Sequence, residues 1–388
     1  MYNAHNLYGL TEHLATANAV SEVREKRPFV LTRSSFLGVG RIGAKWTGDN
    51  GATWDDLKSS IISIMDFNMV GIPMIGAEIC GFNYNTTEEL CARWIEVGAF
   101  YTFSRDHNRI DMIPQELYRW DTVASAGRYA LNLRYRMLPY LYTLFYIAHS
   151  EGKPIIRPLW LTFPRDKEAH QIQTQFMWGD AVMISPVLEA NSTEVHAYFP
   201  QGVWYELATN SFAFDLSTGN GGLYEDLYTP LTKANVHVYG GNILPLQAEG
   251  VMNTVESRAS FYTLFVALDS MGYAEGTLYI DDGEQVVLND YVNIGFHSTV
   301  YSSTNGVLSS MLLDQKGTIS SSSSFSTLVG TVTVLGKMDT LSLPSSFTLN
   351  GKEIDIHTIC SFDKSKSTLT FTFPEGVSLL EDFTMKWS

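Results

Sequence analysis

The sequence has few basic residues, few cysteines and no long apolar run. Its 388 residues include 26 Lys and Arg against 41 Asp and Glu, which gives a formal net charge of −15. This balance argues against a nucleic-acid partner, because phosphate binding needs clustered Lys and Arg. No apolar run reaches the length of a membrane span, and the first twenty residues contain no continuous apolar signal core. We therefore expect a soluble chain without a visible targeting segment or signal peptide.

The three cysteines, Cys80, Cys91 and Cys360, are too few for a disulfide scaffold. Composition alone is equally compatible with three reduced, buried thiols. Two glycosylation sequons begin at Asn85 and Asn191, but short sequons often arise by chance. Composition therefore leaves the redox compartment of the protein open.

Sequence motifs for several common chemistries are also missing. The chain contains no HExxH pair, no GxSxG elbow and no complete phosphate-binding glycine loop. Gly38-Val39-Gly40 alone is not a nucleotide-binding signature. We expect neither a metal site nor a cofactor.

Up to about Gly152 the sequence alternates short β-prone runs with amphipathic helical runs. Helices are expected at residues 4–26, 54–68, 86–98 and 126–151, and strands at 28–32, entering Trp46, at 70–75 and at 100–103. Pro139 should kink the last helix. Alternating elements of these lengths predict parallel strands covered by helices.

From Lys153 onward the helix pattern disappears and strands dominate. They are expected at residues 195–199, 236–239, 261–268, 277–280, 331–335 and 368–373, several with period-two alternation. A weaker boundary falls near Gly250, and the serine-rich run 320–324 should be an exposed loop. We predict an α/β unit over residues 1–152, followed by β-sandwich domains over 153–250 and 251–388.

Four blocks in the first part each end in a polar cluster. They are residues 31–36 (LTRSSF), 46–50 (WTGDN), 76–82 (GAEICGF) and 100–108 (FYTFSRDHN). In a (β/α)8 barrel, chemistry sits at the C-terminal ends of the strands. The four blocks, in this order, resemble the second half of the catalytic barrel of retaining α-glucosidases, glycoside hydrolase family 31. The resemblance implies the C-terminal half of a TIM barrel, followed by a proximal and a distal β-sandwich domain.

Asp49 is the best candidate for general acid/base chemistry. A retaining glycosidase needs two carboxyls roughly 5–5.5 Å apart, of which one attacks the anomeric carbon and the other protonates the leaving oxygen. Gly48 lets the backbone approach closely, and Trp46 offers an apolar wall that favours a protonated carboxyl. The alternative is that Asp49 and Asn50 form a capping turn before the helix at Trp54.

The resemblance assigns roles to the matching residues. Asp49 corresponds to the acid/base of the family. Arg33 and His107 resemble residues that hydrogen-bond sugar hydroxyls, which both donate and accept, and Trp46 and Phe82 resemble walls of the sugar pocket. The alternatives are an Arg in a structural ion pair, a His bonded to a backbone carbonyl, and aromatic side chains in the core.

Glu78 departs from the family pattern, which normally has Asp at this position. The extra methylene displaces a carboxylate that, by resemblance, helps to bind the sugar in subsite −1. A displacement of about an ångström can cost a large factor in rate. Arg105 is expected to brace a neighbouring carboxylate rather than to contact sugar.

The nucleophile of the family lies in a Trp-x-Asp-Met-Asn-Glu segment, and no such segment occurs here. Residues 1–9 resemble the family sequence shortly after it, so the last four of eight barrel strands are expected. Such a half barrel leaves unpaired strand edges and should aggregate, dimerise, or dock onto an N-terminal half chain. The resemblance implies a parent that hydrolyses α-linked glucosides such as maltose, and we expect the isolated chain to be inactive. A non-catalytic carbohydrate-binding protein is the alternative.

The resemblance also bears on the cysteines. The spacing of Cys80 and Cys91 matches a disulfide of extracellular and lysosomal family members. Together with the sequons at Asn85 and Asn191, this pair favours a secreted, vacuolar or lysosomal full-length parent.

Overall fold

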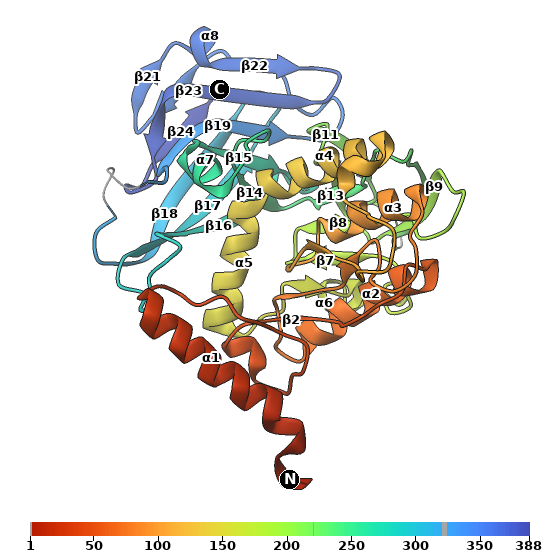
Figure 1. The fold of residues 1–388 in the computed structure, drawn as a ribbon. Helices are drawn as coiled ribbons and strands as arrows, with labels where there is room; N and C mark the ends of the chain where they lie inside the picture. The colour runs from red at the N-terminus through yellow and green to blue at the C-terminus, as the bar shows by residue number, and fades with distance from the viewer. Residues whose placement is uncertain (1, 220, 320–323) are drawn as a thin grey trace.

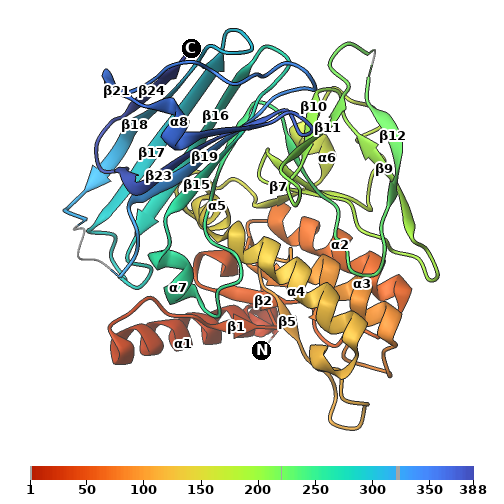
Figure 2. The same ribbon diagram turned by 90° about the horizontal axis from the view of Figure 1, so that it is seen from above.

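The computed structural model describes residues 2–219, 221–319 and 324–388. Residues 320–323 of the predicted serine-rich loop lie outside the described residues. The two chain ends lie at opposite sides of the molecule (Figure 1). In the view of Figure 2, helices from the first part of the chain lie below β-sheets from the second part. The predicted order, half of an α/β barrel followed by β domains, is confirmed.

The α/β part contains four helix-separated strand regions. The helices are α1 (Tyr8–Arg24), α2 (Trp54–Met69), α3 (Glu88–Gly98), α4 (Asp121–Arg136) and α5 (Leu138–Glu151). The strands are β1 (Leu31–Thr32), β2 (Ala44–Trp46), β3 (Ile75–Gly76), β4 (Glu78–Ile79) and β5 (Arg105–Asp106). β1, β2 and β3 pair in parallel, and so do β4 and β5. All these strands therefore point their C-terminal ends toward the same edge.

Two strand predictions were wrong in position. Residues 70–74 form a turn and an irregular segment, because Gly71 has a left-handed φ of 77° and Pro73 has no N–H to give to a ladder. Residues 100–103 are also irregular: the N–H groups of Phe100 and Tyr101 bond back to carbonyls at the end of α3. The strands begin later in the chain: β3 begins at Ile75 and β5 at Arg105.

The predicted helices are present with adjusted ends. Thr53 and Thr87 cap α2 and α3 by accepting backbone N–H groups three residues ahead. The predicted helix 126–151 begins earlier and is broken at Met137, beside Pro139, which confirms the kink. The predicted helix 4–26 begins as a 3-10 segment over Tyr2–Leu7 and becomes α1 from Tyr8.

The β part contains a proximal and a distal sheet. The proximal sheet has the order β11-β10-β13-β8-β7-β6, beside a ribbon of β9 and β12. These strands are β6 (Ile156–Arg157), β7 (Phe176–Trp178), β8 (Val182–Ile184), β9 (Glu194–Phe199), β10 (Val203–Glu206), β11 (Ser211–Asp215), β12 (Leu223–Tyr228) and β13 (Val236–Tyr239).

The distal sheet curls on itself in the order β21-β20-β24-β18-β17-β16-β14-β15-β19-β23-β22 (Figure 2). Its strands are β14 (Asn242–Leu246), β15 (Tyr262–Ala267), β16 (Tyr273–Asp281), β17 (Tyr291–Val300), β18 (Gly306–Lys316), β19 (Leu328–Leu335), β20 (Phe347–Leu349), β21 (Lys352–Ile354), β22 (Cys360–Asp363), β23 (Thr368–Ser378) and β24 (Thr384–Trp387). β14 joins this sheet although it precedes residue 250, and the predicted domain boundaries stay predictions.

The prediction that no helix follows Lys153 was wrong for three short segments. They are α6 (Leu159–Thr162), α7 (Thr254–Ala259) and α8 (Ile356–Ile359). Local capping explains α7, since Asn253 accepts the backbone N–H of Glu256. Helices this short show no periodic apolar pattern in the sequence.

One apolar core runs from the half barrel into the β part. It includes Trp94 and Phe100 of the barrel, Trp178 and Tyr205 of the proximal sheet, and Phe265 of the distal sheet. α5 lies between the half barrel and the distal sheet (Figure 1) and contacts β14 and β16. A second core fills the curl of the distal sheet. The half barrel therefore packs against the β part along one side. The edge at the C-terminal ends of its strands stays accessible.

Candidate active site

The strand-end edge of the half barrel gathers the predicted site residues. Arg33 follows β1, Asp49 follows β2, Glu78 lies on β4, and His107 follows β5. Arg33 Nη1 lies 3.7 Å from Asp49 Oδ1, and the two side chains are 63% and 46% exposed. Gly48, with a left-handed φ of 93°, lies under Arg33: a Cβ there would be 3.3 Å from Arg33 Cδ. The turn after β2 therefore presents Asp49 beside Arg33.

The structure excludes the alternative role of Asp49 as a helix cap. Thr53 is the residue that caps α2, through its hydroxyl and the backbone N–H of Asp56. Asp49 lies four residues earlier, with its carboxylate on the accessible edge.

Glu78 is a buried carboxylate in the middle of this edge. Its side chain is 2% exposed, and Oε1 accepts a hydrogen bond from Arg105 Nη2 at 2.7 Å. His107 Nε2 lies 4.0 Å from the same oxygen. The prediction that Arg105 braces a neighbouring carboxylate is thus confirmed.

Burial raises the pKa of Glu78 to about 7, although the charge of Arg105 and its hydrogen bond oppose this; the nearby Asp49 charge adds to the rise. Burial and the Arg105 charge lower the pKa of His107, with Asp49 acting in the opposite direction. A neutral imidazole offers one donor and one acceptor, which suits a hydroxyl-bearing ligand.

Aromatic rings line the same edge. The Arg105 guanidinium carbon lies 5.1 Å from the centroid of the Trp46 ring, and the rings of Phe82 and His107 are 5.4 Å apart. Within the described residues, Glu78 Oε2 and Trp46 Nε1 are buried without a protein hydrogen-bond partner. The edge therefore combines apolar walls with a buried acceptor and a buried donor.

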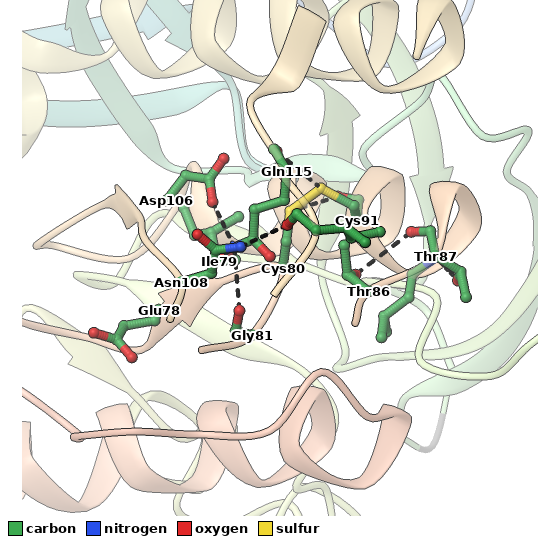
Figure 3. The surroundings of a disulfide bond; sticks show 12 residues. Glu78, Ile79, Cys80, Gly81, Thr86, Thr87, Cys91, Asp106, Asn108 and Gln115 are labelled. Carbon is green, nitrogen blue, oxygen red and sulfur yellow. Dashed lines mark hydrogen bonds between the residues drawn. A yellow bond between two sulfur atoms is a disulfide. The ribbon is translucent and has the colours of Figure 1, made fainter. Parts of the chain in front are cut away.

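Gln115 and Asp106 support the segment that carries Glu78, and the sequence analysis did not identify them. Gln115 Nε2 donates to the carbonyls of Ile79 and Gly81, both at 3.1 Å, and to Asp106 Oδ1 at 2.8 Å (Figure 3). Burial raises the pKa of Asp106 to about 6, opposed by the Gln115 bond and assisted by Glu116. The one available signal was alternation along β5, which places Asp106 opposite to Arg105 and His107.

A disulfide joins Cys80 and Cys91, with their Cα atoms 4.5 Å apart, as the resemblance implied. It ties the turn after β4 to α3 (Figure 3). Cys80 and Gly81 both have left-handed φ angles, 69° and 93°, a conformation that costs energy at Cys80. Cys360 remains a half-buried free thiol. The disulfide therefore holds in place the turn that lies between Glu78 and Phe82.

The sequon residues Asn85 and Asn191 are both exposed. Asn85 lies in the loop between the two bridged cysteines, where its Oδ1 accepts the backbone N–H of Ile113. Asn191 lies before β9, and its N–H donates to Glu89 on α3. A glycan would be attached through the amide nitrogen of either side chain.

The described residues contain no competing site with acidic or metal-binding side chains. They hold no cluster of three or more His, Cys, Asp or Glu side chains suited to a metal ion, and no helix among them is long and apolar enough to cross a membrane. A hollow of about 610 Å³ lies on the distal sheet, between Tyr301 and Trp387, but no Asp or Glu side chain lines it. The chemistry therefore locates the candidate site at the strand-end edge.

Comparison with known proteins matches the α/β part and the following β part of the chain to two domains of one family. Residues 1–144 match the glycosyl hydrolases family 31 TIM-barrel domain, and residues 152–244 match the glycosyl hydrolase family 31 C-terminal domain. A probable alpha-glucosidase of Oryza sativa subsp. japonica is 52% identical over 283 residues, which cover 73% of this chain and 32% of that protein. The lysosomal alpha-glucosidase of Bos taurus is 40% identical over 401 residues, covering 100% of this chain and 41% of its own length.

A solved structure agrees at the level of the whole chain. The glucosidase II alpha subunit, crystallised with Tris, superimposes with a TM-score of 0.87 at 29% identity, covering 99% of this chain and 42% of that one. The chain thus spans 32% to 42% of the length of these similar proteins. Two domain matches in the family's own order, supported by these relatives and this structure, show that the chain belongs to glycoside hydrolase family 31.

Proposed function

We propose that this chain carries the acid/base side of a retaining, exo-acting α-glucosidase site that cleaves α-linked glucosides such as maltose. Hydrolysis also needs a nucleophilic carboxylate, supplied by a Trp-x-Asp-Met-Asn-Glu segment that these 388 residues do not contain. The proposal is supported by family membership and by the α-glucosidase names of the similar proteins.

The residues of the edge take the following roles. Asp49 protonates the leaving oxygen while the nucleophile attacks the anomeric carbon, and it then removes a proton from the water that releases the sugar. Arg33, Glu78 and His107 hydrogen-bond the hydroxyls of the non-reducing glucose. Trp46 and Phe82 exclude water from its faces, which strengthens those hydrogen bonds.

One observation carries the proposal: a buried carboxylate with one oxygen bonded to Arg105 and the other without a partner among the described residues. Arg105 holds Glu78 Oε1 at 2.7 Å, while Oε2 is buried and without a partner among the described residues. An unsatisfied buried acceptor costs about 1–3 kcal/mol, and a sugar hydroxyl placed at Oε2 removes that cost. Trp46 Nε1 offers the complementary buried donor at the same edge.

Kinetics test the role of Asp49. The chain alone should not hydrolyse maltose, whereas its complex with a chain that carries the nucleophile segment should. In that complex, Asp49→Ala should abolish maltose hydrolysis but retain glucosyl transfer from an aryl glucoside whose leaving group needs no protonation. Added azide should then displace the enzyme carboxylate from the glucosyl intermediate and yield the α-glucosyl azide, with net retention. Turnover by the chain alone, abolished by Asp49→Ala, contradicts the requirement for a second segment.

Calorimetric titration with maltose distinguishes the alternative, a non-catalytic carbohydrate-binding protein. The unpaired acceptor at Glu78 and donor at Trp46 are present in this chain by itself. Saturable binding by the chain alone, lost in His107→Ala, favours the binding protein. Binding that requires the second segment favours the split catalytic site.

The side of the half barrel away from the β part suits an N-terminal half chain. Within the described residues β1 pairs with β2 alone and β5 with β4 alone, so each offers a strand edge. Phe29, Phe36 and Leu37 are exposed beside β1, at 58%, 43% and 62%. A chain carrying the first four β/α units should co-purify with this one and protect those side chains from solvent.

Maturation in the secretory pathway is supported by the Cys80–Cys91 bridge and the exposed sequons. A glycosidase that removes N-linked glycans should lower the apparent mass of protein from its native source. Asn85→Gln and Asn191→Gln should each remove one step of that shift, and an unchanged mass would show that neither sequon is used.

A further inference from the structure

The side chain of Asn50 joins the segment after β2 to β4, beyond the point where the pairing of β2 with β3 stops. β2 pairs with β3 as far as Trp46 and Gly76, and the N–H of Thr47 still donates to Gly76 O at 3.0 Å. Gly48 then turns the chain away. The side chain of Asn50 returns to the strand end: its Oδ1 accepts the N–H of Glu78 at 2.9 Å, and its Nδ2 donates to Glu78 O at 3.0 Å.

The backbone of Asn50 holds a third segment. Its carbonyl oxygen accepts the N–H of Phe82 at 2.8 Å and that of Asn83 at 3.0 Å. In return, Asn83 Nδ2 donates to the carbonyl of Asp49 at 2.7 Å. The peptide beside Asp49, the backbone of Glu78 and the turn that carries Phe82 are therefore joined at one residue.

We propose that Asn50 is a positioning residue, which fixes the carboxyl of Asp49 relative to that of Glu78 and keeps Glu78 buried. The assignment of the two carboxyls rests on the proposed function, but the bonds that join their backbones do not. Asn50 carries no charge and has used its side-chain donor and acceptor on Glu78, so it acts through its neighbours rather than on a sugar.

Asn50→Ala removes both bonds to the backbone of Glu78. The strand end then loosens and water reaches the Glu78 carboxyl, so its pKa should move from about 7 back toward its ordinary value. Hydrogen exchange at the Glu78 amide, which loses its acceptor, should accelerate by a factor of about ten, because a bond worth 1.4 kcal/mol corresponds to a factor of ten. The amides of Phe82 and Asn83 keep the backbone carbonyl of Asn50 as acceptor, so their exchange should accelerate less.

Asn68→Ala is a matched control. Asn68 is a buried amide of α2 that also bonds backbone groups, accepting from Ile155 and Ile156 and donating to Ile64. Its loss should lower the Tm, as Asn50→Ala does, but leave the titration of Glu78 unchanged. Asn50→Asp keeps the acceptor for the Glu78 N–H and loses the donor, so its effect on exchange should be intermediate.

The measurement is carbon-13 NMR of glutamate-labelled 388-residue chain, with the Glu78 signal identified in Glu78→Gln, together with amide exchange. The inference fails if Asn50→Ala titrates and exchanges like the unsubstituted chain, or if Asn68→Ala alters Glu78 equally. Should Asn50→Ala not fold, Asn50→Asp decides by the same criteria. Since no turnover is measured, failure here is distinct from failure of the α-glucosidase proposal, which rests on Asp49→Ala.

Discussion

The half barrel has two sides that differ in how their polar and apolar groups are satisfied. Toward the β part, Arg93 of α3 is fully buried and donates to the carbonyls of Ser192, Thr229 and Pro230. On the same side Asp281, also fully buried, accepts from Arg27 and from Tyr142. Arg93 and Arg27 therefore donate hydrogen bonds to groups on the other side of this interface.

On the opposite side of the half barrel, the described residues show no such pairing across an interface. β1 and β5 have open edges, and aromatic and aliphatic side chains such as Phe29 and Leu37 face solvent. Exposed apolar groups beside a strand edge are typical of a surface that another chain covers. The difference is the one that the proposed N-terminal half chain requires: one side of the half barrel is an interior contact, and the other side is uncovered.

The largest effect should come from breaking the satisfied side. Arg93→Ala leaves three carbonyls and the buried carboxylate of Glu96, now 3.0 Å from Arg93 Nη1, without their donor. The free energy of unfolding should fall by about 3–5 kcal/mol, measured by urea denaturation. Replacing both partners, Arg93→Met with Glu96→Leu, should recover part of the loss. An effect under 1 kcal/mol for Arg93→Ala would show that this interface is not what holds the two parts together.

The disulfide connects the two sides and should have the next largest effect. Cys80 lies at the site turn and Cys91 on α3, eleven residues apart. Replacing both by Ser removes a constraint on the unfolded chain worth about 2–3 kcal/mol for a loop of this length. The same loss should follow reduction of the unsubstituted chain, while Cys360→Ser should behave like the parent. Equal stability of oxidised and reduced chain would contradict this.

Glu96, on the side toward the β part, and Glu78, at the strand-end edge, are both buried carboxyls. The pH dependence of the unfolding free energy tests each of them. Burial raises the pKa of Glu96 to about 8 despite Arg93, and that of Glu78 to about 7 despite Arg105. A carboxyl whose pKa is higher in the folded protein binds more protons there, so stability falls as pH rises from about 4.5 through the folded pKa.

The contribution of these two carboxyls to the unfolding free energy should therefore decline across this window and level off above about pH 8. It is measured as the difference between the parent chain and Glu78→Gln, up to about pH 7, and between the parent chain and Glu96→Gln, up to about pH 8. A difference that rises over the window would show that the hydrogen bonds of the two arginines outweigh burial.

The smallest effect should come from the open side. Phe36→Glu changes an exposed side chain, so the stability of the chain alone should change by no more than about 0.5 kcal/mol. The same substitution should weaken association with an N-terminal half chain at least tenfold, measured by calorimetry. If Phe36→Glu instead unfolds the chain alone, this side is already a packed surface and the comparison is wrong.

The sequence predicted the order of the elements and the edge where the site lies, because both follow from patterns within short segments. The block at 46–50 marks a strand end whatever surrounds it. The strand at 70–75 was misplaced because Gly71 and Pro73 interrupt its first part. The strand at 100–103 was misplaced because Phe100 and Tyr101 are buried at the end of α3, where their N–H groups bond back to it. The bonds of Asn50 and Gln115 were not predictable, since each depends on the backbone of a segment distant in sequence.

The core that joins the two parts has a consequence for how the chain unfolds. The family matches divide the sequence between residues 144 and 152, yet Trp178 of the proximal sheet donates its indole N–H to the carbonyl of Phe100 in the barrel. Arg136 of α4 likewise donates to Leu207. The division between the two family matches thus passes through one shared core. The barrel half and the proximal sheet should melt together in one calorimetric transition, and neither should survive as a separate folded piece.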